Sequence, residues 1–90
     1  MVVVTLPSQL AGLAGGRRNF ELQAHTLSEV FERLHEQVPM IRSQIFDSSG
    51  ALRQFVAVFV DGKQAYLQGA GNGSLHAESQ VLIVLSVAGG

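Results

Sequence analysis

The order of apolar and polar residues divides the first quarter of the chain into two strands and a connection. A β-branched run over residues 2–6 predicts a first strand. Residues 8–17 contain three glycines and two arginines, so a loop or wide turn is expected there. Residues 19–23 then place apolar side chains at every second position, which is the period of a half-buried strand. The two strands are predicted to form a hairpin.

The next segment has the spacing of an amphipathic helix. The Thr26 hydroxyl can accept a hydrogen bond from the backbone three residues on, and Glu29 can reach back to the N–H group of Thr26. This pair is a capping box, and Pro39 ends the helix. The apolar stripe of the helix comprises Leu27, Val30, Phe31, Leu34 and Val38.

The middle of the chain is predicted to be irregular before it enters the clearest strand. Residues 40–53 contain turn signals such as the sequence DSSG, with a short helical turn expected near Ile41. Residues 54–63 then form a strand that ends in an Asp61-Gly62 turn, which is typical of a β-hairpin.

The last third of the chain completes the pattern. Residues 64–68 are expected to add a short edge strand, and residues 69–74 a flexible glycine-rich loop. Residues 81–87 are a continuous β-branched and leucine run, typical of a central strand. A hairpin, a crossing helix and a last strand beside the first make the β-grasp plan. We therefore predict an α+β β-grasp domain over residues 1–87, with a mixed four- to five-stranded sheet on one main helix.

Composition narrows the class of protein. The 90 residues leave room for one small domain, in which 47% of residues are apolar and only 14% are charged. So few charges leave apolar surface exposed, and an exposed apolar patch commonly contacts a partner. The formal net charge of −1 argues against a nucleic-acid partner, because phosphate binding needs a basic face.

The familiar signals of catalysis, metal binding and targeting are missing. The sequence has no cysteine, which excludes a disulfide framework, a thiol nucleophile and a cysteine zinc site. His35-Glu36 begins like a zinc-protease motif, but Pro39 stands where the second histidine would fall. No apolar run reaches the roughly 20 residues that span a bilayer, and no signal peptide is expected. We expect a cytoplasmic protein with no bound cofactor and no active site of its own.

The C-terminal Gly89-Gly90 pair is the feature with the clearest chemical meaning. Residues 88–90 are expected to form a flexible tail, and glycines without side chains let its carboxylate enter a narrow channel in another protein. Adenylation by ATP would turn that carboxylate into an acyl donor, which a sulfur nucleophile could then attack. Chain ends are often glycine-rich for no such reason, so the pair alone leaves both interpretations open.

Together with the element order, four segments resemble the ubiquitin-like sulfur carrier family. They are VTLP at the start, HTLSEVFERL in the helix, RQFVAVFVDG in the third strand and VLIVLSVAGG at the end. The family includes the thiamine-pathway carrier, the small subunit of molybdopterin synthase and a cysteine-pathway carrier, and FVAVFVDG and VAGG most resemble the last. Many members have a D-G-D-type turn before the final strand, whereas this chain has HAESQ, in which only Glu78 is acidic.

The resemblance implies a carrier with enzymes as partners. A ubiquitin-activating-type adenylyltransferase would use ATP to adenylate Gly90, next to Gly89, and a sulfurtransferase or sulfide would supply the sulfur of a C-terminal thiocarboxylate. An acceptor enzyme would then receive the sulfur. A cysteine synthase and a metallopeptidase are among the implied partners, whereas nucleic acid and membranes are not.

Strand alternation and the resemblance together predict a docking surface on the sheet. The valines at positions 56, 58 and 60 should face the helix, as should Val81, Ile83 and Leu85, and the residues between them should face outward. A shift of one residue in the register would exchange the two faces. Members of the family carry an apolar docking surface on the outward face. The predicted partner-binding residues are Phe59, Leu82, Val84, Val87 and Ala88.

Three other functions stay open. A small subunit of molybdopterin synthase would form a stable complex with a large catalytic subunit. A ubiquitin-like modifier would form isopeptide conjugates with lysines of other proteins. A β-grasp binding module would work without Gly89 and Gly90. The sequence also leaves open the sulfur-containing product, and whether a longer precursor is processed to expose the glycine pair.

Overall fold

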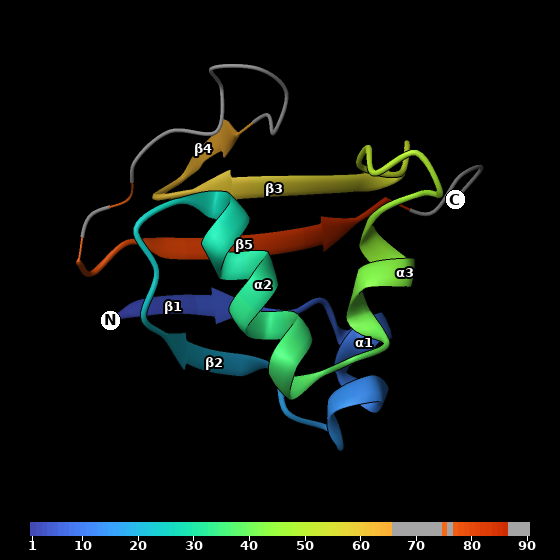
Figure 1. The fold of residues 1–90 in the computed structure, drawn as a ribbon, viewed down its shortest axis with the longest axis horizontal. Helices are drawn as coiled ribbons and strands as arrows, with labels where there is room; N and C mark the ends of the chain where they lie inside the picture. Colours follow the sequence, from blue (N-terminus) through green and yellow to red (C-terminus); the bar gives the residue numbers. More distant parts are fainter. Residues whose placement is uncertain (66–74, 76, 87–90) are drawn as a thin grey trace.

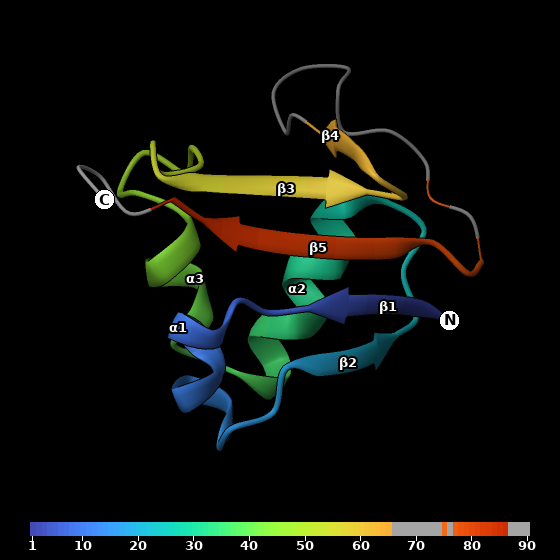
Figure 2. The ribbon, with the colours of Figure 1, turned by 180° about the vertical axis from the view of Figure 1, so that it is seen from behind.

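The structure is a mixed sheet with helices on one face. The computed structural model describes residues 1–65, 75 and 77–86. Its five strands are β1 (Val2–Thr5), β2 (Asn19–Leu22), β3 (Val56–Val60), β4 (Lys63–Ala65) and β5 (Gln80–Leu85). Its helical segments are α1 (Ser8–Ala11), the 3₁₀ turn η1 (Gly12–Ala14), α2 (Leu27–Gln37) and α3 (Ile41–Ile45). Helix α2 crosses one face of the sheet (Figure 1), and the sheet stands in front of it in the reverse view (Figure 2).

The last strand lies in the middle of the sheet. The strand order is β2-β1-β5-β3-β4. β5 pairs in parallel with β1 and antiparallel with β3, whereas the β1–β2 and β3–β4 pairs are antiparallel. These pairings confirm the predicted hairpin at the start of the chain, the position of the last strand beside the first, and the short strand at one edge.

The connection between β1 and β2 is helical, so the prediction of a loop over residues 8–17 is wrong. α1 buries Leu10 and Ala11 against the rest of the protein. η1 then ends at Gly15, whose φ of 66° lies in the left-handed region that glycine adopts without strain. The glycines of this segment therefore end a short helix rather than prevent one, and burial of Leu10 stabilises it.

The predicted capping box at the start of α2 is present, but one of its two hydrogen bonds has another donor than predicted. The Thr26 hydroxyl accepts a hydrogen bond from the Glu29 N–H group at 3.2 Å, as expected. The Glu29 carboxylate accepts from the N–H group of His25 at 2.6 Å, not from that of Thr26. Thr26 is in an extended conformation, and this turns the preceding N–H group toward the carboxylate. This hydrogen bond from His25 holds the pKa of Glu29 below its usual value.

The variant Thr26→Ala is expected to lose about 1 kcal/mol of stability, because one N–H group of the first turn loses its acceptor. Urea denaturation followed by circular dichroism measures the change. Thr26→Ser keeps the acceptor and is the matched control. Equal stabilities of the alanine variant and the unmodified chain would contradict a contribution from this cap.

The core lies between α2 and the inner face of the sheet. The five predicted apolar residues of the helix are all at most 3% exposed. The inner face of the strands supplies the buried residues Val2, Val4, Phe20, Leu22, Val56, Val58, Val81 and Ile83. The predicted helical turn near Ile41 is confirmed as α3, which adds Ile41 and Ile45 to the same core.

Candidate functional site

The outer face of the sheet carries an apolar patch on β3 and β5. Phe59 and Leu82 are direct cross-strand partners, and Val84 lies on the diagonal from Phe59. Leu82 is 43% exposed, whereas Val81 and Ile83 on either side of it are 1% and 0% exposed. This alternation confirms the predicted faces of both strands. It does not test whether a partner binds there.

The patch extends along β3 beyond the residues predicted from the sequence. Phe55 is 42% exposed, and its carbonyl accepts a hydrogen bond from the Ser86 N–H group at 2.7 Å, which continues the β3–β5 ladder. Ala57 is the cross-strand partner of Val84 and is partly exposed. We define the outer patch as Phe55, Ala57, Phe59, Leu82 and Val84. Strand alternation places Phe55 and Ala57 on the outward face as well, but they are not among the predicted partner-binding residues.

A tight turn closes one end of the outer patch. Asp61 and Gly62 have φ values of 50° and 86°, which a two-residue hairpin turn requires and which confirm the turn predicted there. The Asp61 carboxylate accepts a hydrogen bond from the Gln80 N–H group at 2.9 Å, so the turn is tied to the start of β5. A hollow of about 390 Å³ lies here, lined by Phe59, Asp61, Gly62, Gln80 and Leu82. It offers space for an apolar side chain of a partner.

The opposite end of the outer patch is where the described part of β5 ends, at Ser86. Val87 and Ala88, predicted to bind a partner, follow in the sequence and lie outside the described residues, as do Gly89 and Gly90. Their roles, the tail predicted over residues 88–90 and the loop predicted over residues 69–74 therefore stay predictions.

Other candidate chemistry does not converge in the part of the chain that the structure describes. Within residues 1–65, 75 and 77–86, no group of histidine and acidic side chains is placed to hold a metal ion. His25 lies before α2 and His35 lies in its last turn, while His76 is outside the described residues. None of the helices in these ranges is long and apolar enough to cross a membrane.

Comparison with solved structures matches the whole chain. CysO of Amycolatopsis orientalis, in a BexX/CysO complex, gives a TM-score of 0.87 with 22% identity and 100% coverage of both chains. CysO of Mycobacterium tuberculosis gives 0.85 with 25% identity, over 97% of this chain and 100% of that chain. SAMP1 of Haloferax volcanii gives 0.78 with 23% identity, over 99% and 98%. This is the ubiquitin-like β-grasp fold.

The β-grasp fold confirms the predicted fold class, with five strands and with α1 and α3 in addition to the main helix. The structural neighbours are ubiquitin-like sulfur carriers or modifiers, and they are small carrier proteins rather than enzymes. The resemblance predicted from the sequence is therefore confirmed at the level of the β-grasp fold. Comparison with protein-family models and with curated proteins gives no match.

Proposed function

We propose that the chain is a sulfur carrier whose C-terminal Gly90 carboxylate is converted into a thiocarboxylate by a partner enzyme. The observation that carries the proposal is that β5, at the centre of the sheet, leads from the outer patch into the sequence VAGG. A glycine pair four residues beyond a central strand presents a carboxylate close to a surface on which a partner can dock. The fold shared with CysO at a TM-score of 0.87 supports the same function.

The proposed chemistry has two steps, both carried out on a partner that binds ATP. An oxygen of the Gly90 carboxylate attacks the α-phosphorus of ATP, which releases pyrophosphate and leaves an acyl adenylate. Hydrosulfide then attacks the acyl carbon, and AMP leaves with the electrons of the broken C–O bond. If a sulfurtransferase persulfide attacks instead, a second thiol must cleave the resulting acyl disulfide. The absence of a side chain on Gly90 leaves the acyl carbon open to attack.

The outer patch is proposed to hold the partner while the tail reaches its active site. Phe59, Leu82 and Val84 supply the apolar contact area, and Val87 and Ala88, which precede the glycines in the sequence, are proposed to bind the partner as well. The hollow lined by Phe59 and Leu82 is proposed to receive an anchoring apolar side chain of the partner. The acceptor of the sulfur is proposed to be a cytoplasmic biosynthetic enzyme, with a cysteine synthase as the first candidate and a metallopeptidase as an accessory partner.

The intact mass of the protein tests this function. The chain is incubated with the ubiquitin-activating-type adenylyltransferase of the same organism, ATP and sulfide, and its mass is measured. A gain equal to the replacement of one oxygen by sulfur is expected, and omission of ATP should prevent it. An unchanged mass with an enzyme that forms adenylate on another carrier would contradict the proposal.

The variant Leu82→Asp is expected to bind the activating enzyme at least about 10-fold more weakly, because an unpaired charge would be buried in the contact. Binding is measured by titration calorimetry. Gln23→Asp is the matched control, since it adds the same charge to an exposed residue that follows β2 and lies outside the outer patch. Equal losses in the two variants would contradict a specific role of the patch.

A second candidate function is that of a protein modifier. The observation that favours it is the match to SAMP1, a small archaeal modifier protein, at a TM-score of 0.76 over 96% of the chain. A lysine amine would then attack the acyl carbon of the same adenylate, or of a thioester formed from it, and give an isopeptide bond as AMP or the thiol leaves. Conjugates of higher mass that contain this chain, and that disappear when Gly90 is removed, would identify this function.

A further inference from the structure

Most arginines lie at one end of the strands of the sheet, and several carboxylates lie at the other end. β1 runs parallel to β5, while β2 and β3 run antiparallel to it. The end of β1, the start of β2 and the start of β3 therefore lie at the edge of the sheet where β5 ends, next to α1 and α3 (Figure 1). We call this edge the tail end. Its arginines are Arg17 and Arg18 before β2, Arg42 in α3 and Arg53 before β3.

Carboxylates lie at the opposite end. The Asp61 carboxylate accepts a hydrogen bond from the Gln80 N–H group at the start of β5. Glu78 lies two residues before Gln80 in the sequence. Glu21 lies near the end of β2, beside the same edge.

Two charges lie against this separation, since Lys63 follows the Asp61-Gly62 turn at the far end and Asp47 lies beside Arg42 and Arg53 at the tail end. The four arginines still outnumber Asp47 at the tail end, and the three carboxylates outnumber Lys63 at the far end. The protein therefore has a positive tail end and a negative far end although its formal net charge is −1.

Three of these arginines donate a hydrogen bond from the Nε atom to an uncharged backbone carbonyl. The Nε atom of Arg18 donates to the Leu6 carbonyl at 3.0 Å, and that of Arg53 to the Ser43 carbonyl at 3.0 Å. Arg17 donates to the Asn19 carbonyl at 3.1 Å, and its guanidinium carbon lies 4.4 Å from the centre of the Phe20 ring. A guanidinium fixed in this way loses little conformational entropy when it meets an anion.

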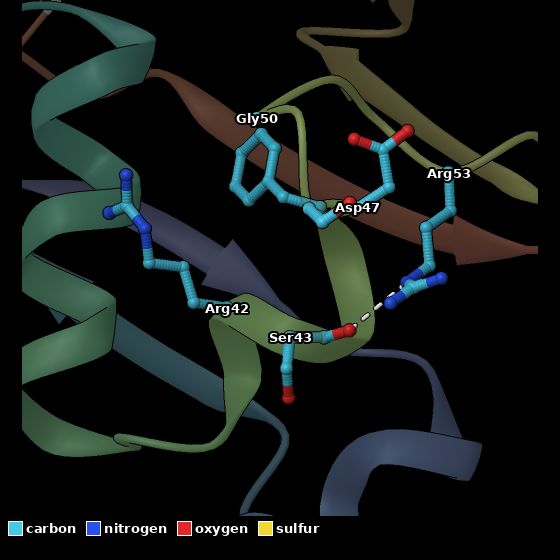
Figure 3. A pocket seen from close by; sticks show the side chains of 7 residues that line it. Arg42, Ser43, Asp47, Gly50 and Arg53 are labelled. Atoms are coloured by element: carbon cyan, nitrogen blue, oxygen red, sulfur yellow. Dashed lines mark hydrogen bonds between the residues drawn. The ribbon is translucent and has the colours of Figure 1, made fainter.

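No carboxylate of the described residues forms an ion pair with these arginines; the two ion pairs found there are His25–Glu29 and Arg33–Glu36. Arg42 and Arg53 line one pocket of about 510 Å³ and stand on opposite sides of it (Figure 3). Asp47 lies at the same pocket, but its carboxylate accepts hydrogen bonds from the Ser49 hydroxyl at 2.6 Å and from the Ser49 and Ala51 N–H groups. The Ser49 bonds are the main cause of the lowered pKa of Asp47, and the charge of Arg53 lowers it further, so Asp47 offsets part of the positive charge at this pocket.

We propose that the tail end is an electrostatic docking surface for a protein with carboxylates around the entrance that receives the tail. This inference rests on the proposed function. Four residues follow Ser86, and an extended segment of that length spans at most roughly 14 Å. An enzyme whose reaction centre reaches Gly90 must therefore come close to the surface on which the arginines lie. The groups of the partner that complement these arginines in charge are carboxylates.

The separation of charge also orients the protein as it approaches such a partner. The positive tail end is attracted to an acidic entrance while the carboxylates near Asp61 are repelled, so encounters with the tail in front are favoured. Oriented attraction of this kind raises the rate of association more than the final affinity, and salt weakens it. A nucleic acid fits these observations less well, because the negative far end and the net charge of −1 oppose binding to a long polyanion.

Association rates test the inference. The double variant Arg42→Gln/Arg53→Gln is expected to associate with the activating enzyme about threefold to tenfold more slowly at low salt, with a weaker dependence on salt concentration. The double lysine variant keeps both charges and should retain most of the rate, which separates charge from the structural role of the Arg53–Ser43 bond. Arg33→Gln in α2 removes an arginine elsewhere and should have little effect. A rate that is independent of salt, or an equal loss in Arg33→Gln, would overturn the inference.

Binding of simple anions distinguishes this inference from the proposed function. Titration with a deca-glutamate peptide, followed by amide NMR shifts, should affect residues around Arg18, Arg42 and Arg53 even if no thiocarboxylate can be formed. Sulfur loading without these shifts or rate effects would overturn the docking surface and leave the carrier function standing. Tighter binding of a DNA duplex or of phosphatidylserine vesicles than of deca-glutamate would overturn the assignment to an acidic protein.

Discussion

Deletion of Gly90 is expected to abolish the gain of sulfur and to leave the fold unchanged. The deletion moves the terminal carboxylate back by one residue, which is about 3.5 Å in an extended chain. A displacement of about 1 Å between reacting groups already costs on the order of 100-fold in rate. The partner would therefore still bind the outer patch, but the carboxylate of Gly89 would not reach the α-phosphorus of ATP.

Three measurements make this result specific. Intact mass after incubation with the activating enzyme reports the loading of sulfur, calorimetry reports binding, and thermal unfolding reports the fold. Gly90→Val is a second variant that keeps the length and places a branched side chain beside the acyl carbon, and it should also load poorly. Normal loading of the deletion variant would show that Gly90 is not the site, whereas loss of binding together with loading would indicate an altered docking surface.

Ile83→Ala is expected to destabilise the protein by about 2–5 kcal/mol, because it leaves a cavity where a fully buried side chain packs in the central strand. The adjacent variant Leu82→Ala should cost less than about 1 kcal/mol, since the Leu82 side chain is 43% exposed on the outer face. The two variants lie side by side in β5 and differ in which face of the sheet they alter.

Urea denaturation with a common slope for both variants measures the difference. A loss of 2–5 kcal/mol is a large part of the stability of a domain of this size, so Ile83→Val, with an expected loss of about 0.5–1.5 kcal/mol, provides a variant that stays folded. Binding to the activating enzyme should show the reverse order, with the larger loss in Leu82→Ala. Equal destabilisation by the two alanine variants would contradict the register of β5.

Alternation made the sheet predictable from the sequence. In β3 and β5 the side chains of one face are needed for the core, so a register shifted by one residue would expose Val58 and Ile83 and is strongly disfavoured. The same reasoning indicated the position of the outer patch. The capping box of α2 was predicted with the correct cap but the wrong reciprocal donor, because the donor depends on how the chain enters the helix.

Other features depend on contacts that a linear pattern does not contain. The connection over residues 8–17 becomes helical because the core accommodates Leu10, whereas its local composition favours a loop. The separation of charge was not predicted either, since Arg17, Arg42 and Arg53 are distant in the sequence. Arg17 and Arg53 share one end of the protein because β2 and β3 both run antiparallel to β5. Arg42 joins them because α3 lies beside the start of β3, where Arg53 donates to the Ser43 carbonyl. A sequence analysis could find this pattern once the strand order is known.

The central position of β5 has a consequence for biosynthesis. Val4 pairs with Val81, so the parallel contact that joins the two halves of the sheet links residues from opposite ends of the chain. Contacts of such long range form late, because the loop between them must first be closed. While a ribosome is still adding the last residues, β1 and β3 have no strand between them and the sheet cannot be completed. A nascent chain that stops before residue 80 is therefore expected to stay unfolded and to be degraded, so that copies without β5 do not accumulate.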